Sequence, residues 1–192
     1  TKANTCQCSD FKLVTVGGLP DCTITAPSSV CANSTGNDAS VADAGAGATY
    51  AWGITGGTIT STPPYTNAIK WNAGGGPTAN ITITVTKANT CQCSDFKLVT
   101  VGALPDCTIS APSSVCVGST GNTASVPSQG GVTYTWTVKG AGVLANGQGT
   151  NSITWNATAV GTANIEVTVS NGNGCECSNS VGVPVNPLPD CT

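Results

Sequence analysis

Cysteine is the residue type in this chain best able to do chemistry, and its eleven copies recur at fixed places. Three Cys-x-Cys pairs occur, and each is followed by a Leu-Pro-Asp-Cys sequence. Cysteines in such number and regularity are typical of disulfide-bonded proteins in oxidising, extracellular settings. A structural zinc site would need four clustered ligands at Cys-x-x-Cys or similar spacing, and the chain has no His. We therefore expect disulfides and an extracellular location.

The remaining composition leaves little for catalysis or for binding polyanions. Only 8% of the residues are charged, and there is no Arg, His or Met. General acid–base work usually needs His, and oxyanion or phosphate stabilisation often needs Arg. The net charge is −3 and the six Lys are dispersed, so no basic stripe is available for phosphates. We expect no enzymatic activity, no nucleic-acid partner and no membrane insertion in this segment, whose apolar runs are short.

Aspartate is the other candidate for site chemistry. Asp21, Asp106 and Asp190 recur once per Leu-Pro-Asp-Cys junction, and Asp10 and Asp95 follow Cys-x-Cys pairs. A calcium ion shared between domains is conceivable, but calcium takes six to eight oxygen ligands with several carboxylates. Isolated Asp residues more often accept hydrogen bonds from turn amides. We therefore expect no cofactor, with interdomain calcium as the weaker alternative.

These residues sit in a tandem array. The segment 1–31 returns almost unchanged at 86–116, and a diverged third copy begins at Cys175. Leu-Pro junctions without Gly/Ser linkers predict stiff connections between domains. The domain boundaries that we predict are 1–20 for the C-terminal strand of a preceding repeat, 21–105 and 106–189 for two full repeats, and 190–192 for the start of a following repeat.

Each repeat alternates apolar and polar residues with a period of two. In the second repeat Val132, Tyr134, Trp136 and Val138 share one face of a strand. Short strands, Gly/Asn/Pro punctuation and no helical periodicity predict an all-β fold, an antiparallel sandwich of about seven strands per repeat. Exposed aromatics would form a sugar-binding platform, whereas in-phase Ala, Val and Ile neighbours favour the core. The predicted core aromatics are Tyr50, Trp52, Trp71, Tyr134, Trp136 and Trp155.

Phe96 and Leu98 are predicted to point outward from the strand that follows the second Cys-x-Cys pair. Their counterparts in the second repeat are Ser180 and Gly182, so folding does not require the outward apolar pair. The pair either packs under a neighbouring loop or forms a lateral contact surface.

The series APSSVC, GSTGN, TYTWTV, NGQGTNSITW and ANIEVTVSNGNGC in the second repeat resembles the PKD-like, immunoglobulin-type repeats of very large secreted surface proteins of Bacteroidota-type bacteria. The resemblance covers both full repeats. It implies tandem Greek-key sandwiches in an adhesin exported by the type IX route, of the gliding-motility kind. This chain departs from the pattern in its doubled cysteines and in the sequence TSTPPYTNAIKW, which replaces NGQGTNSITW.

Four cysteines per repeat allow three disulfide pairings, and a bond within Cys-x-Cys would close a strained small ring. Two pairings remain, both of which join the Cys-x-Cys pair to the two cysteines that open the repeat. The resemblance places the cysteine of the Val-Cys sequence opposite the first one of the hairpin pair, with the swapped register as the alternative. Cys6, Cys8 and Cys191 would then find partners outside this sequence. The expected bonds are Cys31–Cys91, Cys22–Cys93, Cys116–Cys175 and Cys107–Cys177.

Together these features predict a non-enzymatic, disulfide-stabilised repeat segment of a long extracellular adhesin or filament, supporting adhesion or gliding motility. Its partners would be neighbouring repeats of the same chain, surface polysaccharide or other copies of the filament. Two alternatives stay open: an array of carbohydrate-binding modules attached to a secreted enzyme, and a self-assembling filament or surface-layer subunit.

Overall fold

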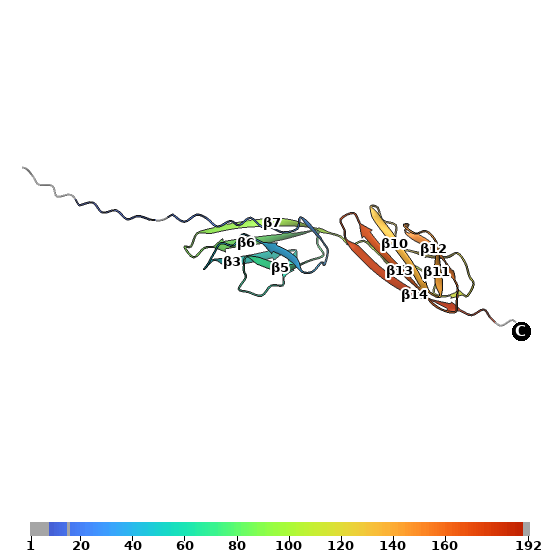
Figure 1. Ribbon diagram of the computed structural model, residues 1–192. Coiled ribbons are helices and arrows are strands. Elements are labelled where there is room, and N and C mark those ends of the chain that lie inside the picture. Colours follow the sequence, from blue (N-terminus) through green and yellow to red (C-terminus); the bar gives the residue numbers. More distant parts are fainter. Residues whose placement is uncertain (1–7, 15, 190–192) are drawn as a thin grey trace, which may run out of the picture.

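The computed structural model describes residues 8–14 and 16–189, which form two β-sandwiches placed end to end (Figure 1). Throughout this described part the regular secondary structure is entirely β. Accordingly, no helix there is long and apolar enough to cross a membrane. The predicted fold class, tandem immunoglobulin-like β-sandwich repeats, is confirmed.

The first sandwich packs a four-stranded sheet, ordered β1-β7-β6-β3, against a three-stranded sheet, ordered β2-β5-β4. The chain forms strands where Val, Ile and aromatic residues alternate with Thr and Asn. Gly, Pro or Asn marks the turns between the strands. Its strands are β1 Ser29–Cys31, β2 Asn37–Ser40, β3 Thr49–Thr55, β4 Gly57–Ile59, β5 Ala68–Ala73, β6 Thr78–Thr86 and β7 Gln92–Gly102.

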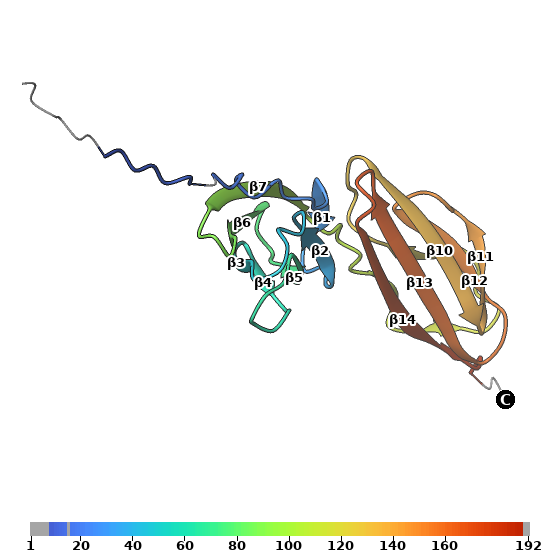
Figure 2. The same cartoon turned by 60° about the vertical axis from the view of Figure 1, so that its left-hand side comes forward.

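The second sandwich repeats this topology, with sheets ordered β10-β13-β14-β8 and β11-β12-β9 (Figure 2). A long antiparallel hairpin, β6–β7 in the first sandwich and β13–β14 in the second, forms the centre of each larger sheet. Its strands are β8 Val115–Cys116, β9 Asn122–Ser125, β10 Val132–Gly140, β11 Gly142–Asn146, β12 Ser152–Ala157, β13 Gly161–Asn171 and β14 Glu176–Asn186.

A short parallel pairing closes one edge of each larger sheet. β1 pairs with the C-terminal end of β7, so Cys31 lies opposite Gly102. In the second sandwich β8 pairs with the end of β14 in the same way, and Cys116 lies opposite Asn186. The Val-Cys cysteines therefore lie at the pole where each long hairpin ends, far from its turn.

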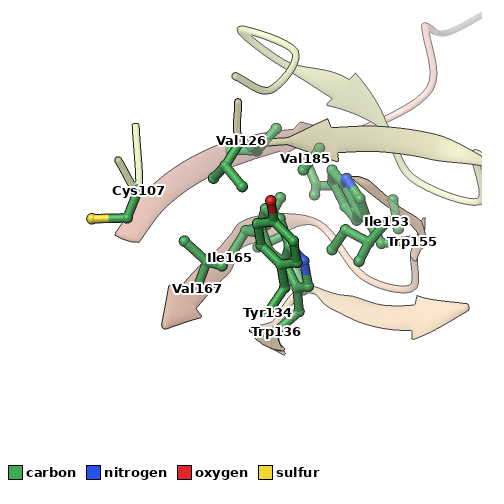
Figure 3. Packing of buried hydrophobic residues seen from close by; sticks show 14 of the residues in the cluster. Cys107, Val126, Tyr134, Trp136, Ile153, Trp155, Ile165, Val167 and Val185 are labelled. Atoms are coloured by element: carbon green, nitrogen blue, oxygen red, sulfur yellow. The ribbon is translucent and has the colours of Figure 1, made fainter. Parts of the chain in front are cut away.

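Each sandwich has its own apolar core between its two sheets. Figure 3 shows the core of the second sandwich. The alternation read from the sequence brings in-phase side chains inward, and Trp71 and Trp155 are completely buried. Burial of a large aromatic removes roughly 150–250 Å² from water, which compensates for the scarcity of Phe and Leu. The predicted core aromatics Trp52, Trp71, Tyr134, Trp136 and Trp155 are buried, and Tyr50 is half-buried against the first core.

Residues 8–14 and 16–20 belong to no strand, although their counterparts near the end of the first repeat lie in β7 and the connector after it. The segment contacts the first sandwich at Gly17 and Gly18, and residues 8–14 run away from it as an extended arm (Figure 1). Our prediction that it completes a preceding repeat stays a prediction. Residues 1–7, with Cys6, lie outside the described residues, as do Asp190 and Cys191.

Candidate functional site at the joint between the repeats

Both sandwiches contain one internal disulfide at corresponding places. Cys22 bonds Cys93 with 6.1 Å between the Cα atoms, and Cys107 bonds Cys177 with 5.8 Å. Each bond attaches the segment that opens a repeat to the beginning of its last long strand. Both pairings agree with the expected map. Cys22 and Cys107 are buried, so these bonds are also part of the cores.

The third disulfide contradicts the expected map, because it joins the two repeats. Cys31 of the first sandwich bonds Cys175 of the second, with 5.5 Å between their Cα atoms. The predicted Cys31–Cys91 and Cys116–Cys175 bonds are therefore wrong. The parallel pairing of β1 places Cys31 at the C-terminal end of β7, whereas Cys91 precedes the other end. β7 is 11 residues long, so its ends lie ~35 Å apart, far beyond the ~7 Å that a disulfide tolerates between Cα atoms.

The joint around this bond is compact. The side-chain amide of Asn171 donates a hydrogen bond to the carbonyl oxygen of Ala103 at 3.1 Å. The Sγ atom of Cys175 lies 4.0 Å from the carbonyl oxygen of Gly102. A Cβ atom at Gly102 would lie 3.3 Å from that sulfur, so a residue without a side chain suits this close approach. Cys175 is almost completely buried.

The three disulfides together close one covalent ring across the joint. The ring passes along residues 22–31, crosses to the second repeat through Cys31–Cys175, and returns through Cys107–Cys177, the backbone of residues 93–107 and Cys22–Cys93. Two covalent routes therefore link the sandwiches, namely the backbone connector and the Cys31–Cys175 bond. A second route restricts bending and twisting at the joint more than the backbone connector alone would.

Three described cysteines are not bonded: Cys8, Cys91 and Cys116. Cys8 and Cys116 are exposed and Cys91 is half-buried. Cys91 lies in the β6–β7 turn region, at the place that Cys175 takes in the second repeat. Cys116 lies at the end of β8, at the place of Cys31 in the first.

The junction aspartates act as turn acceptors in the structure. Asp21 accepts a hydrogen bond from the backbone of Thr23, and Asp106 accepts one from that of Thr108, each at 2.8 Å. Hydrogen bonds from the hydroxyl and amide of Thr23 hold the pKa of Asp21 below its usual range, and the amide and hydroxyl of Thr108 do the same for the pKa of Asp106. Across residues 8–14 and 16–189, no three His, Cys, Asp or Glu side chains gather as a metal site would need. Asp10 is exposed on the arm, and the Asp95 carboxylate accepts a hydrogen bond from the amide of Phe96.

The two sandwiches differ beside the edge strands β3 and β10. In the second, the side chain of Gln148 bonds the backbone of Trp136, accepting from its N–H at 2.8 Å and donating to its carbonyl at 2.9 Å. Counting back from Trp155 and Trp71, Pro64 takes the place of Gln148 in the first repeat. A hollow of about 540 Å³ lies there. Its lining includes Tyr50, Trp52, Pro63, Pro64, Tyr65 and Thr66.

The outward apolar pair on β7 is exposed as expected: Phe96 is 62% and Leu98 59% accessible to solvent. They lie across from Thr82 and Asn80 of β6, so a polar strand flanks them. Both side chains are largely open to solvent, so within residues 8–14 and 16–189 neither packs under a loop. The lateral-contact explanation remains.

The joint and the loop carrying Gln148 were not singled out from the sequence. One signal for the inter-repeat bond was present. The Leu-Pro-Asp-Cys junction is too short to separate the sandwiches, and cysteines that recur in every repeat can bond across repeats as well as within one. The edge-capping role of Gln148 had no comparable signal, because it depends on the path of a loop.

Comparison with known proteins supports the repeat architecture. The family model described as "PKD-like domain" matches residues 19–101 and again 103–185. No curated protein matches the chain. Among solved structures, the chain matches the D00-D0 domain of intimin, with 15% identity, a TM-score of 0.37, and coverage of 84% of this chain and 98% of that one.

Two further structures are similar at comparable levels. Adhesin InvE of Yersinia pseudotuberculosis shares 15% identity with a TM-score of 0.30, over 84% of this chain and 59% of that chain. Bacteroides ovatus SGBP-B, in complex with a mixed-linkage heptasaccharide, shares 16% with a TM-score of 0.32, over 92% and 48%. At these values no ligand or function transfers. The family model matches two consecutive stretches that together make up most of the chain, and the protein therefore belongs to the PKD-like domain family.

Proposed function

We propose that this chain is a non-enzymatic stalk segment of an extracellular cell-surface adhesin or filament, of the kind used in adhesion or gliding motility. Its task is to hold other parts of the assembly at a distance from the cell. Such a segment must resist extension under load and bending at its joints. The observation that carries the proposal is the covalent ring across the joint, closed by the Cys31–Cys175 bond.

The disulfides protect the sandwiches from tension applied at the chain ends. Cys22–Cys93 and Cys107–Cys177 bridge 71 and 70 residues of sequence, so a pull bypasses most of each sandwich. An unfolded residue spans at most ~3.3–3.6 Å, so each bond withholds on the order of 250 Å of extension. The Cys31–Cys175 bond supports the connector in parallel.

Single-molecule force spectroscopy tests the load-bearing role. The oxidised protein is expected to extend without unfolding steps, because each sandwich is bypassed by a disulfide. After reduction, two unfolding steps are expected, one for each sandwich, and each should lengthen the chain by on the order of 250 Å. Equal lengthening of the oxidised and reduced chains would contradict the stalk proposal.

Small-angle X-ray scattering tests the stiffness of the joint. The Cys31→Ser variant removes the second covalent route, and we expect a broader distribution of overall dimensions than in the parent. Cys116→Ser is the matched control, because this counterpart of Cys31 is unbonded in the structure. Similar scattering from all three proteins would show that the backbone connector alone sets the joint.

The hollow beside β3 supports carbohydrate binding as a second candidate function. It combines the half-buried side chains of Tyr50 and Tyr65 with Pro63 and Pro64, and aromatic faces stack on sugar rings. Trp52 lines the same hollow and reports on it by fluorescence. A surface polysaccharide would be the ligand, whether the chain serves in an adhesin or beside a secreted enzyme.

A loop exchange tests this candidate. Residues 62–66, Thr-Pro-Pro-Tyr-Thr, are replaced by the Asn-Gly-Gln-Gly-Thr of residues 146–150, which are equal in number. If the hollow binds sugar, soluble surface polysaccharide quenches the fluorescence of the parent but not that of the exchanged protein. An unchanged parent spectrum over the whole titration would remove this candidate.

Lateral association is the form that self-assembly would take. Phe96 and Leu98 are the exposed apolar pair on β7, and other copies of the filament would contact them. The variant Phe96→Ser/Leu98→Gly copies the second repeat. It is expected to abolish any concentration-dependent sedimentation of the parent, and persistence of the association would place the contact elsewhere.

A further inference from the structure

The unbonded cysteines Cys91 and Cys116 occupy the two places that Cys175 and Cys31 occupy at the bonded joint. Cys91 holds the Cys175 place in the first repeat, and Cys116 holds the Cys31 place in the second. We propose that each is a cross-linking site for a further repeat of this kind, packed end to end against the pole where it lies. Every joint of the array would then carry one inter-repeat disulfide.

Cys91 and Cys175 make the same backbone contact through their sulfur atoms. The Sγ atom of Cys91 lies 3.6 Å from the carbonyl oxygen of Gly17, as that of Cys175 lies 4.0 Å from the carbonyl oxygen of Gly102. Gly17 and Gly102 are the same position of the repeated segment. The arm therefore meets the first sandwich by the route that the connector takes to the second.

A second contact repeats in the same way. The ammonium group of Lys87 donates a hydrogen bond to the carbonyl oxygen of Gly18 at 3.0 Å. At the bonded joint, Asn171 takes the place of Lys87 and donates to the carbonyl of Ala103, the counterpart of Gly18. The β6–β7 turn of the first sandwich, which we call its N-terminal pole, therefore already makes the contacts that the second sandwich makes at the bonded joint. The missing part is a strand like β1 from a preceding repeat, which would carry the second cysteine.

The C-terminal pole presents the other half of the joint. Cys116 of β8 lies opposite Asn186, as Cys31 of β1 lies opposite Gly102. The amide of Val117 donates to the carbonyl oxygen of Asn186 at 2.8 Å, and the amide of Ala32 does the same to that of Gly102. Cys116 is exposed at this pole, so an approaching hairpin cysteine can reach it.

The bonded Cys175 and the unbonded Cys91 differ in how much of each side chain is exposed to solvent. Cys175 is 1% exposed, because the neighbouring sandwich covers it, whereas its counterpart Cys91 is half-buried. The difference follows from what the first sandwich brings to the bonded joint, namely β1 with Cys31. A further repeat at the N-terminal pole would bury Cys91 to the same degree.

The bond-forming step has a simple balance. Two S–H bonds break and one S–S bond forms between the cysteines. The two protons and two electrons pass to a low-molecular-weight disulfide such as oxidised glutathione, which becomes two thiols. The inference does not depend on the adhesive role, since it concerns how repeats are joined and not what the array binds.

The test extends the chain by one repeat. Residues 1–20 differ from residues 86–105 only by Gly18 in place of Ala103. A second copy of residues 21–85 placed before Thr1 therefore completes a preceding repeat with a natural junction. After oxidation in a glutathione buffer, the unreduced protein is alkylated, digested and mapped by mass spectrometry.

The expected result is a bond between Cys91 and the Cys31 of the added copy, with alkylation of Cys91 reduced to the level of Cys175. The bonds Cys22–Cys93, Cys107–Cys177 and Cys31–Cys175 in the same map show that the original repeats have folded. A bond between Cys8 and the Cys22 of the added copy shows the same for the added repeat.

The matched control changes the Cys31 of the added copy to Ser, and Cys91 should then be alkylated as in the original 192-residue chain. The inference is overturned if Cys91 stays fully alkylated, or bonds another cysteine, while the internal bonds of all three repeats are present. Loss of a polysaccharide or adhesion activity would not bear on this result, and a failed stalk test would leave it standing.

Discussion

The two sandwiches have matching cores and matching internal disulfides, but they differ beside the edge strands β3 and β10. In the second, Gln148 bonds the backbone N–H and carbonyl of Trp136 on β10 and so occupies the edge. In the first, Pro64 takes that place, and the hollow beside Trp52 on β3 remains open. Unpaired strand edges are sites where other chains or ligands add. The second sandwich has closed an edge that the first leaves accessible.

A second difference lies at the tyrosine two residues before this tryptophan on the same edge strand. The Tyr50 hydroxyl donates to the Asp43 carboxylate at 2.8 Å and accepts from the amide of Ala44. In the second repeat Tyr134 instead donates to the carbonyl oxygen of Pro127, and its hydroxyl accepts from the amide of Gln129. The frame of each repeat is therefore fixed by core and disulfides, while the edge and its loops vary. Features that vary are where repeat-specific binding can arise.

The largest predicted effect tests whether the shared frame is equally strong in both repeats. The double variants Cys22→Ser/Cys93→Ser and Cys107→Ser/Cys177→Ser each open a loop of nearly the same length, 71 and 70 residues of separation. Each should lower the free energy of unfolding of its own repeat by about 4 kcal/mol in the chain-entropy model. Hydrogen–deuterium exchange read by mass spectrometry resolves the two repeats. If the two losses in free energy of unfolding differ by more than a factor of two, the internal disulfides do not stabilise the two repeats equally.

The next effect should fall on the second repeat alone. Gln148→Ala removes two hydrogen bonds to the edge of β10, each worth about 0.5–1.5 kcal/mol net, so we expect a loss of about 2 kcal/mol there. Gln92→Ala in the first repeat is the control, since Gln92 makes one exposed bond to Thr86 and should cost less than about 0.5 kcal/mol. Equal, small losses would mean that Gln148 is not stabilising the edge.

The sequence was sufficient for the frame, because alternation of apolar residues determines which side chains enter a sandwich. Trp71 and Trp155 were placed correctly for this reason. It was insufficient for the joint. The resemblance suggested that Cys31 lies near the hairpin turn, whereas the parallel pairing of β1 with β7 carries it to the other pole. That pairing depends on backbone hydrogen bonds between distant segments, such as that from Ala32 to Gly102, which no local pattern reports.

The edge shows the same limit in another form. The exchange of NGQGTNSITW for TSTPPYTNAIKW was visible in the sequence, but its consequence was not. Whether Gln148 reaches the backbone of Trp136 depends on the path of the intervening loop. A glutamine in a polar loop carries no mark that separates an edge cap from a solvated side chain.

A smaller, equal effect is expected in the two cores. Ile81 and Ile165 are corresponding residues, both completely buried. Ile→Val at either position removes one methylene group and should cost about 0.5–1.5 kcal/mol in its own repeat. Urea unfolding of the two variants, with exchange used to assign the loss, measures this. A clear inequality would show that the cores are packed differently despite their matching register.

The smallest predicted effect is an additional pH dependence of stability in the first repeat. The amide of Gly45 and the hydroxyl of Tyr50 hold the pKa of Asp43 below its usual range. A carboxyl group with a lowered pKa in the folded state stabilises above its unfolded pKa of about 4, and that contribution disappears as the pH falls through the folded value. Asp21 and Asp106 have lowered pKa values in corresponding positions, so their contributions cancel when the two repeats are compared.

Between pH 7 and pH 3 the first repeat should therefore lose slightly more stability than the second, and Asp43→Asn should remove the excess. Because Asp43 is fully exposed, the difference should also shrink in high salt. A first repeat that is no more sensitive to acid than the second, measured by exchange at both pH values, would show that the tyrosine contact does not distinguish them.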